Sequence, residues 1–278
     1  MKTFSTFATF AGSLMLAAAP LAAQDPATSA APRPEMSEAE QAGVQQAVDL
    51  GWLVYSYDQA AWHGTDAMLE DLPDARERGV AGWIVNDIAD GWETVFYRPA
   101  KAGGFEAVWA GVYDGRKVIR RTTYTAGERA LVSGEVALVQ ANELLRTQHP
   151  TRCSASPFNT VVFPTGKPDG GLYAYLLTPQ EKTGEFPFGG HHRFEIVGGQ
   201  IKDSRKFTNS CLTMPTANEA GKRPEALSLS HLLDPTPTEI HVFSVYAADL
   251  PVFVMTTGND RVWAVEVSGG KPRIRLIR

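Results

Sequence analysis

The sequence contains few of the signatures by which enzymes and nucleic-acid-binding proteins are usually recognised. It has two cysteines in 278 residues, and no CxxC pair, P-loop, dinucleotide-binding glycine motif or EF-hand loop. Its formal net charge is −5, whereas nucleic-acid binding requires a basic face. We therefore expect no nucleic-acid partner and no bound cofactor. After the N-terminal segment, no run approaches the roughly 20 apolar residues of a membrane span, so none is expected.

The N-terminus has the pattern of a secretory signal peptide. Lys2 supplies a positive charge, residues 4–19 are uncharged and apolar, and small residues precede a cleavage point after Ala23. Residues 1–23 are therefore interpreted as a signal peptide, and the Pro-, Ala- and Ser-rich residues 24–36 as a flexible leader. The mature protein is expected to be periplasmic or secreted.

The two cysteines predict a disulfide. An even cysteine count in an exported chain favours pairing of Cys153 with Cys211. The chain-entropy model assigns the closure of a loop of about 60 residues roughly 4 kcal/mol of stabilisation. The alternative, a nucleophilic cysteine, would need a base and an oxyanion site, and the sequence shows neither.

A long amphipathic segment begins near Ser37. Ser37 followed by Glu40 is typical of a capping box, and apolar residues then recur with helical spacing as far as Leu69. Gly51 interrupts this pattern and could mark a kink or a break, and residues 52–58 could instead form a strand. Pro73 is expected to end the helix.

The rest of residues 37–150 is predicted to contain strands at 80–87, 92–99 and 104–124, followed by a helix at 127–146. Asp114-Gly115 predicts a two-residue hairpin turn, because glycine tolerates the positive φ of a type I′ turn. The spacing of Leu131, Leu138 and Leu145 supports the helix.

Residues 151–278 are predicted to be mainly β. Hairpins are expected at Gly198-Gly199 and Gly269-Gly270, and residues 238–257 are interpreted as two apolar strands joined by a short turn. The predicted class is α+β: N-terminal helices with a small antiparallel sheet, then a larger antiparallel meander. The regions 37–150 and 151–278 could be two domains or one.

The stretch "FPFGGHHRFE" places two histidines side by side. On a strand, His191, Arg193 and Glu195 would share one face, and His192 would point to the apolar opposite face. Since the two imidazoles would point apart, no metal site is predicted. The interpretation is one surface histidine and one histidine packed near the core. A sharper hypothesis is that His191, Arg193 and Glu195 form a surface patch that binds an anionic ligand.

A second candidate lies in "YDQAAWHGTDAM". On a helix, His63 and Asp66 are three residues apart on one face, and a carboxylate in that position can orient an imidazole for acid–base chemistry. The alternative is an ordinary pair of surface side chains.

The segments "PFNTVVFP", "LYAYLLTPQ", "FPFGGHHRFE" and "PTEIHVF" resemble a group of uncharacterised exported bacterial proteins. The resemblance extends over residues 153–267. It implies export and a shared β-rich C-terminal half, and it implies no reaction and no catalytic residue.

Three hypotheses for function follow. The first is a soluble exported binding or accessory protein without catalysis, whose partner is an unidentified small ligand or protein. The alternative is a hydrolase or metal-assisted enzyme that uses His63, Asp66, His191 and Glu195. The third is an interaction module whose sheet edge takes up a partner strand.

Overall fold

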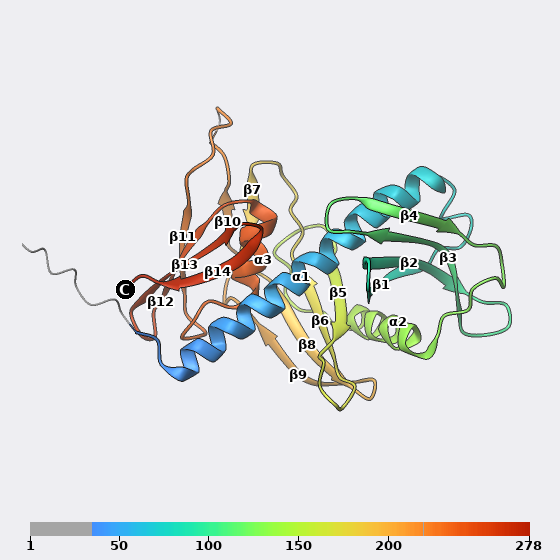
Figure 1. Ribbon diagram of the computed structural model, residues 1–278, viewed down its shortest axis with the longest axis horizontal. Coiled ribbons are helices and arrows are strands. Elements are labelled where there is room, and N and C mark those ends of the chain that lie inside the picture. Colours follow the sequence, from blue (N-terminus) through green and yellow to red (C-terminus); the bar gives the residue numbers. More distant parts are fainter. Residues whose placement is uncertain (1–34, 219) are drawn as a thin grey trace, which may run out of the picture. The chain divides into compact units, whose positions relative to one another are not determined.

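The computed structural model describes residues 35–218 and 220–278, which form an α+β fold (Figure 1). The predicted signal peptide, 1–23, and nearly all of the predicted leader, 24–36, lie outside the described residues. The helices are α1 (Glu38–Asp71), α2 (Ser133–Arg146) and α3 (Glu239–Ala248). No helix among the described residues is both long and apolar enough to cross a membrane.

The described strands form three four-stranded sheets and one short pair. The first sheet has the order β1-β2-β3-β4, made of Gly82–Ile88, Gly91–Pro99, Phe105–Tyr113 and Val118–Thr123. The second has the order β5-β6-β8-β9, made of Asn159–Pro164, Leu172–Leu177, His192–Val197 and Gln200–Lys206.

The third sheet has the order β11-β12-β13-β14, made of Leu227–His231, Val252–Thr256, Arg261–Ser268 and Lys271–Leu276. All neighbours in the four-stranded sheets are antiparallel except β11 and β12, which α3 connects and which run parallel. Strands β7 (Glu185–Pro187) and β10 (Thr213–Pro215) form the short antiparallel pair.

Helix α1 begins where the sequence predicts. The Glu40 backbone N–H donates to Ser37 Oγ at 3.3 Å, and the Ser37 N–H donates to Glu40 Oε2 at 2.8 Å, which completes the capping box. The helix ends at Asp71, two residues before Pro73. It runs through Gly51 without a break, so neither the expected interruption nor a strand at 52–58 is present.

Close packing explains the glycine at position 51. A Cβ there would lie 2.5 Å from Val242 Cβ and 2.7 Å from the Glu239 carbonyl oxygen, both on α3. Glycine therefore lets the two helix backbones approach each other.

Helix α1 also packs on β3, β5 and β14, one strand from each four-stranded sheet (Figure 1). The largest hydrophobic cluster accordingly combines residues from 37–150 and 151–278.

The prediction of two strands within residues 238–257 is wrong for its first half. Residues 239–248 form α3, and only Val252–Thr256 is a strand. Seven consecutive residues from Glu239 to Val245 are buried, so this helix has no polar face to reveal a helical period. Periodicity alone cannot distinguish such a run from a buried strand.

Two other boundaries differ from expectation. The second helix begins at Ser133 rather than 127, because the preceding segment pairs with β3: the Leu131 N–H donates to the Phe105 carbonyl oxygen. The turn at Asp114 is longer than two residues, since the Asp114 carboxylate accepts the N–H groups of Arg116 and Lys117 before β4 begins.

The two predicted glycine hairpins and the predicted disulfide are confirmed. Hairpins turn at Gly198-Gly199 and Gly269-Gly270, where all four glycines have positive φ. Cys153 and Cys211 form a disulfide. This bond ties the segment before β5 to the segment before β10.

The packing at position 51 predicts opposite effects for two glycine-to-alanine changes. Gly51→Ala should lower the free energy of unfolding by more than about 2 kcal/mol, because the new methyl group overlaps α3. Gly134→Ala, in α2 with nothing near its Cβ position, should raise it by up to about 1 kcal/mol through helix propensity. Urea unfolding of both variants tests this, and a stabilised Gly51→Ala protein would contradict the packing argument.

Candidate functional site

The histidine doublet does not form a surface ligand site. His191 is fully buried: its Nδ1 accepts the Thr178 N–H at 3.1 Å, and its Nε2 lies 3.1 Å from the Pro187 carbonyl oxygen, to which it donates. Burial lowers the pKa of His191 to about 4, which keeps the ring neutral at physiological pH. The expectation that His191 lies on the surface is therefore wrong: the ring is buried, and both of its nitrogens form hydrogen bonds with backbone groups.

The other two members of the proposed anion patch already have partners. Arg193 donates to Glu239 of α3 and stacks over the Tyr173 ring at 4.9 Å. Glu195 forms an ion pair with Lys167. The three side chains thus form no common surface patch, and the hypothesis of an anion site at His191, Arg193 and Glu195 fails on burial and pairing.

His63 and Asp66 lie on α1 but do not form a pair among the described contacts. The His63 ring stacks on Tyr113 with centroids 4.9 Å apart, and Asp66 is exposed. No described hydrogen bond or ring contact connects His63 with His191. The described residues contain no group of three or more His, Cys, Asp or Glu side chains placed to hold a metal ion.

Two histidines that appear isolated in the sequence come together in the fold. The rings of His231 and His241 lie 4.7 Å apart, His231 Nε2 is 2.8 Å from Asp234, and Asp234 accepts from Arg205 at 2.8 Å. Both histidines are buried. This cluster fixes the segment between β11 and α3 against β9.

A cleft of about 580 Å³ lies between the middle of α1, the C-terminal half of α3 and the start of β5. This volume falls in the range of about 300–1,000 Å³ typical of small-ligand sites. We call it the Asp58 cleft. Aromatic side chains dominate its walls: Tyr55, Trp62, Trp83, Phe186, Phe243 and Tyr246. Its polar groups are Asp58, Gln59, Thr65, Asn159, Thr160 and Gln180.

The aromatic wall is preassembled. Tyr55 of α1 and Tyr246 of α3 stack with centroids 4.7 Å apart, and the Tyr246 hydroxyl donates to the Gly270 carbonyl oxygen at 3.0 Å. Burial raises the pKa of Tyr246 to about 12, so its phenol stays neutral. Trp62 remains 57% exposed at the rim, where a ligand could cover it.

Asp58 has the most unusual electrostatic environment in the cleft. Burial of its carboxyl raises the pKa to about 6, although side-chain hydrogen bonds from Gln59 and Asn159 act in the opposite direction. No Lys, Arg or His lines the cleft within the described part of the chain. At neutral pH the structure therefore holds a carboxylate in an aromatic cleft without a cationic partner.

Sequence reasoning missed Asp58, although a signal was present. Asp58 lies three residues after Tyr55 and four before Trp62, so it shares a helical face with two aromatic residues. The candidate predicted from the sequence, His63, lies five residues further along the same helix and does not line the cleft.

Comparisons with protein-family models, curated proteins and solved structures find no match for this chain.

The burial of His191 predicts a loss of stability in acid. An unfolded histidine has a pKa near 6.5, and the folded value is about 4, so the unfolded chain takes up a proton first as the pH falls. This contribution to stability is complete above about pH 6.5. It is lost as the pH falls towards 4, by roughly 3 kcal/mol. His241, with a pKa of about 3, acts in the same direction.

Urea unfolding between pH 7.5 and 4.5 measures this effect. His191→Gln should reduce the proton uptake on unfolding by about one, whereas His149→Gln, at an exposed position, is the matched control. Equal pH slopes for the wild type and His191→Gln would refute the assignment.

Proposed function

We propose that this protein is an exported, non-catalytic binding protein whose Asp58 cleft takes a small organic cation. The unpaired Asp58 carboxylate among aromatic side chains is the observation that carries the proposal. A buried charge is costly unless a partner neutralises it. A ligand ammonium group would supply that partner.

The aromatic walls suit the same ligand. Cations bind over the faces of Trp, Tyr and Phe rings, with about 0.5–2 kcal/mol for each favourable contact. The cleft offers Tyr55, Trp62 and Tyr246 beside the carboxylate, and the amides of Gln59 and Asn159 can accept further hydrogen bonds. The apolar part of the ligand would pack on Phe186 and Phe243.

Binding is favoured over catalysis by the lining of the cleft. Asp58 is its one carboxylate among the described residues, and no histidine or cysteine accompanies it. Glycoside hydrolysis canonically uses a pair of carboxylates, and hydroxyl or thiol nucleophiles are commonly activated by an adjacent base.

Export is supported by the N-terminal sequence pattern and is compatible with the disulfide. Residues 1–23 have the charge, apolar core and cleavage pattern of a signal peptide, and disulfides persist mainly in oxidising compartments.

Choline and its uncharged carbon analogue, 3,3-dimethyl-1-butanol, test the cleft. Choline should bind at least tenfold more tightly at pH 7.5, because only choline can neutralise Asp58. Asp58→Asn should abolish the difference, whereas Asp66→Asn, an exposed carboxylate on the same helix, should preserve it. Titration calorimetry measures binding. Equal affinity of the wild-type protein for choline and 3,3-dimethyl-1-butanol would contradict the proposal.

Choline binding should also weaken in acid. With a pKa of about 6, the Asp58 carboxyl is charged at pH 7.5 and about nine-tenths protonated at pH 5, so the affinity should fall by about tenfold. Asp58→Asn should bind choline weakly and equally at both pH values. A pH-independent wild-type affinity would show that Asp58 does not contact the cation.

Export makes a separate prediction. Expressed in a bacterium with its full N-terminus, the protein should appear in the periplasm with an intact mass that begins at Gln24. Replacing residues 4–19 with polar residues should retain the unprocessed chain in the cytoplasm, and unprocessed wild-type protein would contradict export.

A further inference from the structure

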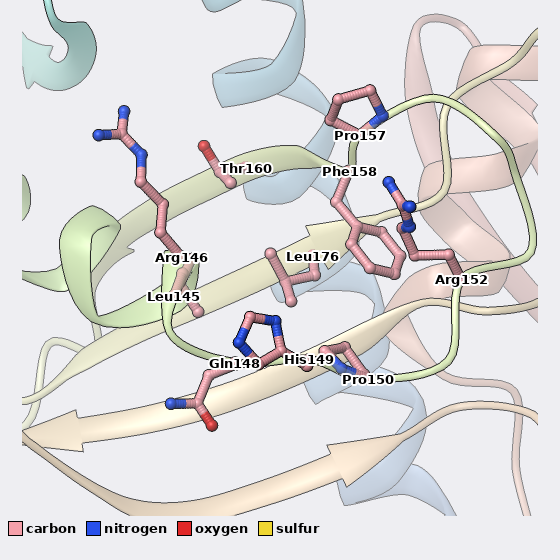
Figure 2. Close-up of a pocket in the computed structure, with 10 residues that line it drawn as sticks. All are labelled: Leu145, Arg146, Gln148, His149, Pro150, Arg152, Pro157, Phe158, Thr160 and Leu176. Carbon is pink, nitrogen blue, oxygen red and sulfur yellow. The ribbon is translucent and has the colours of Figure 1, made fainter.

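A second cavity lies at the C-terminal end of α2 and has the opposite electrostatic character. Its volume is about 520 Å³, and we call it the Phe158 pocket. Leu145 of α2, Leu176 of β6 and Phe158, just before β5, form its apolar floor. Figure 2 shows the Phe158 ring and Leu176 side by side at the centre of the pocket.

This floor is the open edge of a hydrophobic core. Leu145 and Leu176 belong to the cluster between α2 and the second sheet and are almost fully buried, and Phe158 packs against that cluster. A ligand in the pocket would therefore extend an existing core. Burial of the ligand's apolar part on this floor would contribute favourable binding free energy in proportion to the apolar surface that is removed from water.

The rim of the pocket is cationic. Its charged side chains are Arg146 and Arg152; His149 also lines the pocket, and no acidic residue does so within the described part of the chain. The adjacent pocket, of about 480 Å³, shares His149 and adds Arg205 and Lys206, again without a described acidic residue. Such a concentration of positive groups stands out in a chain whose net charge is −5.

Arg152 is the cation best placed to hold a ligand charge. Arg146 already pairs with Glu143 at 2.7 Å, and Arg205 pairs with Asp234 at 2.8 Å. Arg152 forms no ion pair within 4.0 Å with any described residue. Figure 2 shows Arg152 on the Phe158 side of the floor and Arg146 on the opposite side.

We propose that the Phe158 pocket binds a soluble anionic amphiphile with a medium-length apolar chain. The chain lies on Leu145, Phe158 and Leu176, and the carboxylate pairs with the Arg152 guanidinium, whose planar fork suits two parallel hydrogen bonds. The neighbouring cations favour the approach of an anion, and Arg152 itself has no described carboxylate within ion-pair distance to compete with the ligand. This site is separate from the Asp58 cleft, and neither proposal requires the other.

Octanoate and 1-octanol provide the test, because they share a chain and differ in charge. Titration calorimetry of the full mature protein should show saturable octanoate binding with a submillimolar Kd, at least tenfold tighter than octanol. Arg152→Gln should reduce octanoate affinity about tenfold and leave octanol unchanged. Arg116→Gln, an exposed arginine outside the pocket, should change neither.

Two further variants test the role of the apolar floor and the independence of this pocket from the Asp58 cleft. Phe158→Ala should weaken octanoate and octanol alike, since it removes the floor, and Asp58→Asn should alter neither. The proposal is overturned by octanoate binding that is unsaturable, equal to octanol binding, or unaffected by Arg152→Gln. Because Arg152 is exposed, its replacement leaves the folded core intact and the result interpretable.

Discussion

The partly buried ion pair between Arg193 and Glu239 connects the parts of this fold. Glu239 begins α3, and its carboxylate accepts from Arg193 of β8, while the Tyr175 hydroxyl of β6 lies 3.4 Å away. Its carbonyl oxygen meets α1 at Gly51. Removing Arg193 would leave the Glu239 carboxylate buried without its cationic partner, at a cost of up to about 3–5 kcal/mol. One residue thus fixes α3 against both the second sheet and the long helix.

The position of α3 explains the Asp58 cleft. Phe243 and Tyr246 face α1 because Glu239 and Gly51 fix the distance between the two helices. Asp58 is the one acidic residue among the described residues that line this cleft, since Glu239 is paired with Arg193 outside it. The Phe158 pocket depends on a different contact, between α2 and the second sheet, and carries the opposite charge.

Local chemistry made much of the fold predictable. The Ser37 capping box starts α1, paired glycines turn two hairpins, and the two cysteines form a disulfide. Each depends on a few neighbouring residues or on an even count. Two predictions fail because of burial. Helix α3 is buried on all sides, so its sequence shows no helical alternation of polar and apolar residues. Strand alternation places His191 on the surface, whereas its ring is buried and both ring nitrogens form hydrogen bonds with the backbone.

Capping side chains and positive-φ glycines act over three or four residues, so the start of α1 and the turns at Gly198-Gly199 and Gly269-Gly270 are predictable from local sequence, whereas the start of α2 and the whole of α3 are not. Which polar groups remain available for function depends on the tertiary structure. The sequence points to His191, Arg193 and Glu195, whose polar atoms are paired within the fold, whereas Asp58 has no cationic partner among the residues that line its cleft. The reason is physical: the pKa and pairing of a side chain depend on distant residues that only the folded chain brings near.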